Sequence, residues 1–192
     1  MSRKRLFNLT LIIGLFMLSF GYAAVPTVVD DFTLKDVISG KSYSLSDAKD
    51  AKLAVIMFIA TRCPVSNSYN ERMVKLYDDY SSKNVMFFAI NANKNEDSEE
   101  CKEHATEHGF KFPVLKDINN KIADKYDAQV TPEIYVVNAK RELLYHGRID
   151  NSQRESNVES QDLRNALDEL LSGKSVTVKD TKAFGCTIKR VN

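Results

Sequence analysis

A run of eight apolar residues that leads directly to a cysteine–proline pair constrains this chain more than any other feature. Residues 53–60 read LAVIMFIA and carry no charge, which predicts a strand buried on both faces. The segment that follows has the spacing of a helix, and its apolar stripe is formed by Tyr69, Met73, Leu76, Tyr77 and Tyr80. Cys63 therefore stands at a strand-to-helix corner, and Pro64 suits the first helical position because its missing N–H costs nothing there.

This corner gives Cys63 the surroundings of a reactive cysteine. Unpaired N–H groups and the positive end of the helix dipole favour a thiolate over a thiol, and the neighbouring cation Arg62 acts the same way. Ser66 can hydrogen-bond the sulfur or cap the helix, but it cannot act as a second thiol. The alternative is an inert buried cysteine, which is common in proteins. We predict that Cys63 is a nucleophile.

Together with Val130-Thr131-Pro132, the corner resembles the thioredoxin-fold redoxins, the AhpC/TSA and TlpA-like group. The resemblance covers residues 25–173. It implies that Thr131-Pro132 is a cis-proline loop facing the nucleophile, where the backbone of Thr131 pairs with an extended substrate. Glu133 comes next and is expected to line the site. The chain departs from thioredoxins at Ser66, where they carry a second cysteine.

The remaining patterns mostly alternate between strands and helices. Residues 28–45 predict a β-hairpin that turns at Ser39-Gly40-Lys41. Further strands are expected at residues 85–93, 112–115, 134–137 and 143–148, and helices at residues 97–109, 122–126 and 163–171. Asp97 and Glu100 suggest a capping box at the start of the first of these helices. We predict an α/β, thioredoxin-like fold: a central mixed β-sheet flanked by helices on both faces, with an N-terminal β-hairpin.

The N-terminus has the layout of a secretory signal peptide. Arg3-Lys4-Arg5 precedes an apolar run at residues 11–20, and small residues follow around Ala23. The run is too short to cross a bilayer, which takes about 20 residues, so we expect no stable membrane insertion; an uncleaved anchor is the alternative. The expected parts are a signal peptide at residues 1–23, a redoxin domain at 25–173 and a tail at 174–192. The protein is expected to be exported, either periplasmic or extracellular.

Charge and cysteine content narrow the possible partners. The formal net charge is +1, and removal of the signal peptide would change it to about −2. No basic block with interleaved aromatic residues remains, so we expect no nucleic-acid partner. A hydrophobic content of 43% is enough for a proper core. Three cysteines are too few for a disulfide-stapled scaffold but suit a redox site.

The tail carries the cysteine that we expect to pair with Cys63. Phe184 and Ile188 flank Gly185-Cys186, which suggests that the tail docks on the domain. Gly185 allows a sharp backbone turn, and closing so long a loop adds little entropy cost. We therefore expect Cys186 to be the resolving cysteine. Cys101 is the alternative, although its helix must pack on the sheet.

Cys101, His104 and His108 share one face of the second helix, at a spacing that could hold a metal. No fourth ligand or supporting pattern is visible, so we favour a packed cysteine with two partly exposed histidines. No metal or cofactor is predicted.

Three function classes compete. In peroxiredoxins a P-x-x-x-T-x-x-C signature precedes the nucleophile, but Ile56 and Ala60 stand at the matching positions. Copper chaperones of this fold use a second cysteine close by, where this chain has Asn67. A non-catalytic binding module is the related alternative. The preferred class is an exported thiol–disulfide oxidoreductase that acts on protein or small-molecule thiols and disulfides, with a redox partner that supplies electrons.

Overall fold

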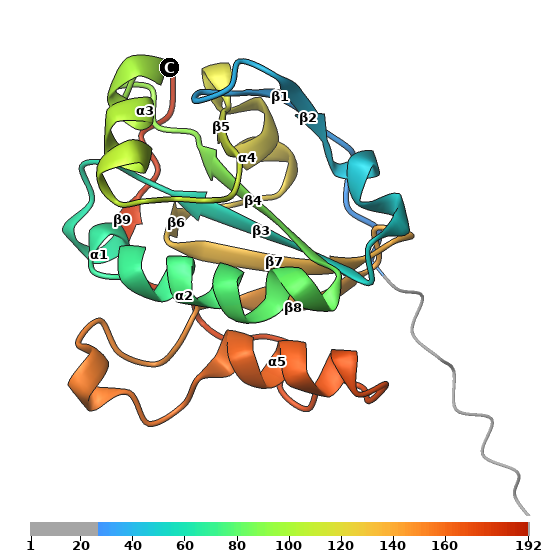
Figure 1. Ribbon diagram of the computed structural model, residues 1–192. Helices are drawn as coiled ribbons and strands as arrows, with labels where there is room; N and C mark the ends of the chain where they lie inside the picture. Colours follow the sequence, from blue (N-terminus) through green and yellow to red (C-terminus); the bar gives the residue numbers. More distant parts are fainter. Residues whose placement is uncertain (1–26, 192) are drawn as a thin grey trace, which may run out of the picture.

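The computed structural model describes residues 27–191, so the predicted signal peptide lies outside the described residues. Seven strands form one sheet in the order β2-β1-β5-β4-β3-β7-β8 (Figure 1). The strands are β1 (Thr33–Asp36), β2 (Ser42–Ser44), β3 (Leu53–Ile59), β4 (Val85–Asn91), β5 (Val114–Lys116), β7 (Glu133–Asn138) and β8 (Leu143–Gly147). β3, β4 and β5 are parallel, whereas the outer strands pair antiparallel, so the sheet is mixed as predicted.

The predicted apolar run forms β3, and all of its residues are buried. It pairs with β4 along one edge and with β7 along the other, and a hydrophobic cluster covers each of its faces, which explains why neither face tolerates a charge. The predicted hairpin is β1–β2, in which Thr33 lies opposite Ser44. Gly40 occupies the turn with a positive φ of 71°, a conformation that glycine adopts at little cost.

Helices cover both faces of the sheet, which confirms the predicted fold class. The helices are α1 (Pro64–Asn67), α2 (Asn70–Tyr80), α3 (Ser98–Glu107), α4 (Lys121–Lys125) and α5 (Asp162–Leu171). On one face, α2 and α5 pack on the side of β3 that carries Val55 and Met57. On the other face, α4 packs on the side that carries Ile56 and Phe58.

Two local expectations were wrong in part. The helix after Cys63 is interrupted between α1 and α2, because the N–H of Tyr69 bonds to Ser66 in a tighter turn and the carbonyl of Ser68 is taken by Arg72. At the start of α3, Asp97 caps the N–H of Glu100 as expected. The Glu100 carboxylate does not complete the capping box, since it bonds to the corner before Cys63 instead.

The tail turns back over the domain after α5. It runs from α5 past α1 and ends beside α3, and on the way it forms β9 (Cys186–Thr187), which pairs with β6 (Val130–Thr131) in a separate two-stranded sheet (Figure 1). The expectation that the tail docks on the domain is therefore correct.

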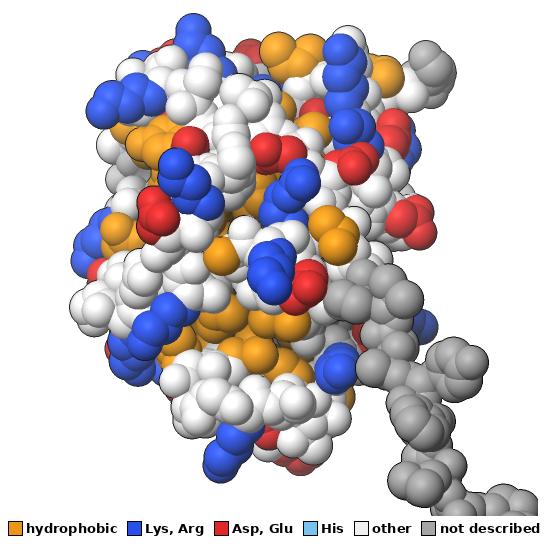
Figure 2. All heavy atoms as spheres, turned by 90° about the vertical axis from the view of Figure 1, so that its right-hand side faces the viewer, with side chains coloured by type: hydrophobic (Ala, Val, Ile, Leu, Met, Phe, Trp, Pro, Cys, Tyr) orange, Lys and Arg blue, Asp and Glu red, His pale blue; other side chains and the backbone are white. Residues whose placement is uncertain are grey.

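One side of the molecule carries charges of both signs. Figure 2 shows Lys and Arg side chains interspersed with Asp and Glu, and hydrophobic side chains gathered in its lower half. This face therefore presents no extended patch of a single charge. Within residues 27–191, no helix has the length and apolar character needed to cross a membrane.

Candidate active site

Cys63 is the N-cap residue of α1 and only 3% of it is exposed. The N–H of Ser66 donates a hydrogen bond to its sulfur over 3.3 Å. The Ser66 hydroxyl accepts from the N–H of Ala60 at 3.1 Å, which ties the first turn of α1 to the end of β3. Because α1 has only four residues, its dipole is small, and the direct N–H contact is the stronger means of favouring a thiolate. Pro64 occupies the first helical position, as expected.

The tail brings Cys186 to this buried sulfur from 123 positions away in the sequence. In the β6–β9 pair, Cys186 lies opposite Thr131. The sulfurs of Cys63 and Cys186 lie at bonding distance and their Cα atoms are 5.8 Å apart, a separation that suits a disulfide. Cys101 is left as a free, buried cysteine. Of the two cysteines considered as partners of Cys63, the structure thus brings Cys186 to it.

The Thr131–Pro132 loop faces the same sulfur. The peptide bond between the two residues is cis, as the resemblance implied. The carbonyl oxygen of Thr131 lies 3.4 Å from the Cys63 sulfur and can accept a hydrogen bond from its thiol form. This loop and the corner of α1 therefore enclose the sulfur from two sides.

Two apolar side chains of the tail hold Cys186 in place. Phe184 packs edge-on against the ring of Tyr69, with centroids 6.4 Å apart. Ile188 is 3% exposed and lies in the core between the sheet and α4, and its N–H donates to the carbonyl of Gln129 over 2.9 Å. The tail is thus anchored on both sides of the cysteine, as its apolar residues suggested.

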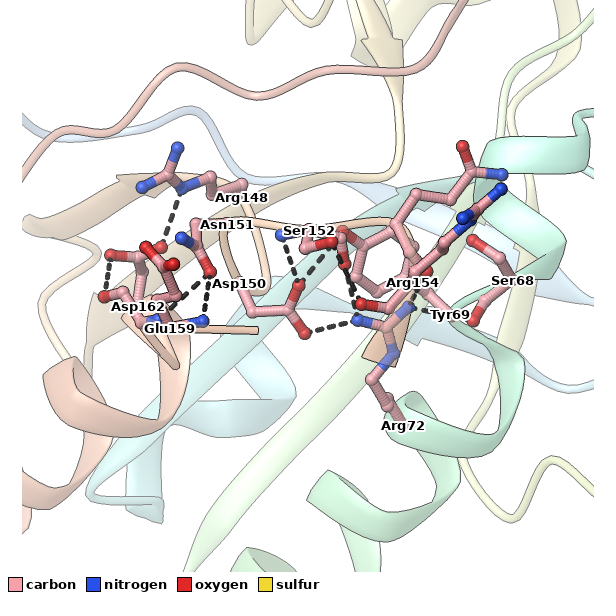
Figure 3. Close-up of polar contacts among 12 residues, drawn as sticks. Ser68, Tyr69, Arg72, Arg148, Asp150, Asn151, Ser152, Arg154, Glu159 and Asp162 are labelled. Carbon is pink, nitrogen blue, oxygen red and sulfur yellow. Dashed lines mark hydrogen bonds and ion pairs between the residues drawn. The ribbon is translucent and has the colours of Figure 1, made fainter. Parts of the chain in front are cut away.

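Tyr69 is itself fixed by a buried ion pair that links α2 to the loop after β8. Its hydroxyl donates to Asp150 at 3.1 Å, and Asp150 pairs with Arg72 at 2.6 Å (Figure 3). The guanidinium of Arg72 also lies 3.7 Å over the Tyr69 ring. The ring that receives Phe184 is therefore held by contacts at its hydroxyl and on its face.

Arg62, next to Cys63 in the sequence, pairs with Glu100 of α3. Its guanidinium forms a two-point ion pair with Glu100, at 2.7 and 2.6 Å, and its side chain is 58% exposed. The Glu100 carboxylate therefore compensates part of the positive charge beside Cys63. The contribution of Arg62 to the reactivity of Cys63 stays a prediction.

A buried carboxylate that sequence reasoning missed supports the same corner. Glu96 is 3% exposed and accepts hydrogen bonds from the N–H groups of Thr61 and Arg62, at 2.9 and 3.1 Å. It follows β4, which is parallel to β3, so the C-terminal ends of both strands meet at one edge of the sheet. That topology was the available signal: a polar residue just beyond β4 should lie near the loop that carries Cys63.

Glu133 supports the proline loop from behind. Its carboxylate accepts from the N–H groups of Gln129 and Val130, at 2.8 and 3.1 Å, and pairs with His146 at 2.8 Å. Burial opposes ionisation of Glu133, but the hydrogen bond from His146 and those from the two N–H groups outweigh it and lower the pKa of the carboxyl. The hydrogen bonds of this carboxylate go to the loop and to His146 and not to Cys63, so Glu133 holds the loop in position.

His146 connects that support to the tail. Its second ring nitrogen lies 3.0 Å from a carboxylate oxygen of Asp180, a tail residue. The hydrogen bond to Glu133 raises the pKa of His146, burial opposes this, and the bond to Asp180 adds to the rise. The side-chain contacts from Asp180 to His146 and from His146 to Glu133 therefore join the tail to the loop that faces Cys63. Sequence reasoning missed His146.

Cys101 belongs to the core of the domain. It is 1% exposed, and burial raises the pKa of its thiol to about 12. His104, on the same helix, bonds to Asn67 at 3.1 Å and lies 4.4 Å from the ring of His108. Among residues 27–191, no three His, Cys, Asp or Glu side chains are grouped so as to hold a metal ion.

The comparisons with known proteins agree with this geometry. The model of the AhpC/TSA family matches residues 25–146. The chain belongs to the AhpC/TSA family. The chain is similar to the thiol-disulfide oxidoreductase ResA of Halalkalibacterium halodurans, with 25% identity over 155 residues that cover 74% of this chain and 86% of ResA.

Two solved structures match over most of this AhpC/TSA chain. An uncharacterised conserved protein of Geobacillus kaustophilus has a TM-score of 0.81 and 35% identity, and the match covers 86% of this chain and 92% of that one. A hypothetical protein of Sinorhizobium meliloti has a TM-score of 0.80 and 31% identity, with coverage of 89% and 97%. A thioredoxin domain of a Bacteroides vulgatus protein matches with a TM-score of 0.62 and 18% identity over 78% of this chain and 99% of that one, which confirms the thioredoxin-like fold. The match to the AhpC/TSA model confirms the resemblance to redoxins.

Proposed function

We propose that Cys63 is the nucleophile and Cys186 the resolving cysteine of this chain, which is a thiol–disulfide oxidoreductase. The observation that carries the proposal is the β6–β9 pairing, which brings a cysteine from a distant tail to Cys63, the N-cap residue of α1. ResA, a similar protein, is named for the same activity.

The proposed exchange proceeds in two steps. The Cys63 thiolate attacks one sulfur of a substrate disulfide, forms a mixed disulfide and releases the second substrate sulfur as a thiolate. The Cys186 thiolate then attacks the Cys63 sulfur, releases the substrate as a thiol after protonation, and leaves the Cys63–Cys186 disulfide. The N–H of Ser66 supports the reverse reaction as well, because it stabilises Cys63 whenever it leaves as a thiolate.

Features of the site argue against the other two classes. At the positions of the peroxiredoxin signature, Ile56 and Ala60 are buried and apolar, so they offer a peroxide no hydroxyl group. Asn67 stands where a copper chaperone would have its second cysteine, and its amide bonds instead to the carbonyl of Thr61 at 2.8 Å and to His104. Disulfide exchange needs neither a peroxide pocket nor a metal site.

Export is a further part of the proposal. The basic cap, the apolar run and the small residues around Ala23 support a signal peptide. A lasting Cys63–Cys186 disulfide also suits an oxidising compartment. N-terminal sequencing of the exported protein should find a start near Ala24 or Val25, whereas an intact Arg3-Lys4-Arg5 terminus on a cytoplasmic protein would overturn this part.

The test of the proposed function is a matched pair of cysteine variants given a model disulfide substrate. Cys186→Ser should accumulate the mixed disulfide on Cys63, because nothing in the chain resolves it. Cys101→Ser should turn over at nearly the wild-type rate, because that thiol is buried and takes no part. The reverse pattern would make the tail a structural accessory and move the resolving role to α3.

A further inference from the structure

The docked tail occupies a strand edge directly beside the nucleophile. Val130 lies opposite Thr187 and Thr131 opposite Cys186 in an antiparallel pair. An edge of this kind can hold only one strand at a time. An extended peptide that carried its own cysteine to Cys63 along this edge would have to take the place of the tail.

The residue before the tail cysteine is under a tight steric limit. A Cβ atom built at Gly185 would overlap the carbonyl oxygen of Thr131 and approach the backbone of Pro132. Those obstacles are backbone atoms, which cannot move aside as the end of a flexible side chain can. Only glycine therefore fits at this place in the strand while the cysteine stays next to Cys63.

The residues two places before and two places after the cysteine are held by apolar surfaces. Phe184 contacts the ring of Tyr69, which the Arg72–Asp150 ion pair keeps in position (Figure 3). Ile188 is buried in the core beside α4. Thr187, in contrast, is exposed. The site thus contacts Phe184, Gly185 and Ile188 closely, whereas the side chain of the residue after the cysteine is exposed.

We infer that the tail shows the form of the peptide that this site accepts: an extended segment with glycine directly before the reactive cysteine, an aromatic residue before that glycine and an aliphatic residue two places after the cysteine. Peptide and tail exclude each other, so a peptide enters only when the tail is released. The inference rests on the proposed function, since it requires Cys63 to be the sulfur that joins the peptide.

A peptide of residues 182–189, with its cysteine joined to thionitrobenzoate, provides the probe. The Cys63 thiolate attacks the peptide sulfur, the bond to the aromatic sulfur breaks, and the coloured thionitrobenzoate anion is released. Each step exchanges one disulfide for another, so no further oxidant or reductant is needed. The free reagent dithiobis(nitrobenzoate) reports separately on whether Cys63 reacts at all.

The same glycine can be changed in the protein and in the probe. In the full-length Cys186→Ser protein, the further substitution Gly185→Ala should loosen the tail and raise the rate with the peptide. Replacing the glycine of the peptide by alanine should lower the rate by about tenfold or more, because the alanine Cβ of the bound peptide would then overlap the carbonyl of Thr131. Replacing its phenylalanine or isoleucine by alanine should lower the rate less. Lys182→Ala, at an exposed tail position, is the matched control in the protein.

The outcomes separate the inference from the proposed function. Equal rates for the glycine and alanine peptides, with Cys63 still reactive toward the free reagent, would overturn the inference and leave the proposed function standing. An unchanged peptide rate on adding Gly185→Ala would overturn the mutual exclusion. A Cys63 that fails even with the free reagent would overturn the proposed function, and the inference with it.

Discussion

Cys186 lies directly opposite Thr131 in the β6–β9 pair, and the carbonyl of the same threonine lies 3.4 Å from the sulfur of Cys63. One residue of the proline loop therefore contacts the buried cysteine and holds the strand of its partner. This arrangement links the redox state of the site to the position of the tail, because the disulfide and the strand pairing hold the same segment.

An external thiol should reduce the disulfide by attacking Cys186. Cys63 is 3% exposed, whereas Cys186 is partly accessible, and Cys63 is the better leaving group because the N–H of Ser66 stabilises its thiolate. A thioredoxin whose second cysteine is replaced by serine should therefore be trapped on Cys186, as mapped by mass spectrometry of the complex. An adduct on Cys63 would show that the tail opens before the attack.

Ser66→Ala should destabilise the protein. The substitution leaves the buried N–H of Ala60 without its acceptor, which costs about 1–3 kcal/mol of unfolding free energy. Urea denaturation measures the loss, and Ser68→Ala, two residues further along and exposed, is the matched control. Equal effects of the two substitutions would mean that the Ser66 hydroxyl does not support the corner.

Stability should fall as the pH rises through the pKa of His146. The raised pKa of His146 in the folded state means that its stabilisation is complete below the unfolded value of about 6.5 and is lost above the folded value. Glu133, whose pKa is lowered, stays ionised throughout this range. The groups that face the ring are Glu133, Asp180 and, by stacking at 4.5 Å, Tyr135.

The difference between wild type and His146→Gln isolates this effect. The unfolding free energy of the variant, measured from about pH 6 to pH 9, should decline less than that of the wild type. A His146→Gln profile parallel to that of the wild type would exclude His146 as a pH-dependent anchor of the tail.

The three thiols should differ in their alkylation. In the reduced protein at neutral pH, Cys63 should react with iodoacetamide before Cys186, and Cys101 should react last because burial raises its pKa to about 12. Denaturant should remove most of the difference between Cys101 and the others. A native protein in which Cys101 reacts first would show that the assignment of the nucleophile is wrong.

Local patterns predicted the parts of this fold that depend on neighbouring residues. Three such patterns can be interpreted without knowledge of distant segments: the uncharged run of β3, Pro64 after Cys63, and the apolar residues Phe184 and Ile188. The buried strand, the start of α1 and the docking of the tail followed from them.

Contacts between distant segments could not be predicted in the same way. Glu96 accepts a hydrogen bond from Thr61, 35 positions earlier, and Glu100 pairs with Arg62, 38 positions earlier. The contact of Glu96 follows from the parallel pairing of β3 with β4, whereas that of Glu100 depends on where α3 lies relative to β3, which no spacing in the sequence specifies. The register that places Cys186 opposite Thr131 is likewise set by packing of the whole tail.

Disulfide mapping by mass spectrometry, on protein isolated under thiol trapping, tests the central claim most directly. The account predicts a linked pair of peptides that contain Cys63 and Cys186, with Cys101 recovered as a free thiol. A Cys63–Cys101 linkage, or Cys186 free in protein whose Cys63 is oxidised, would contradict it.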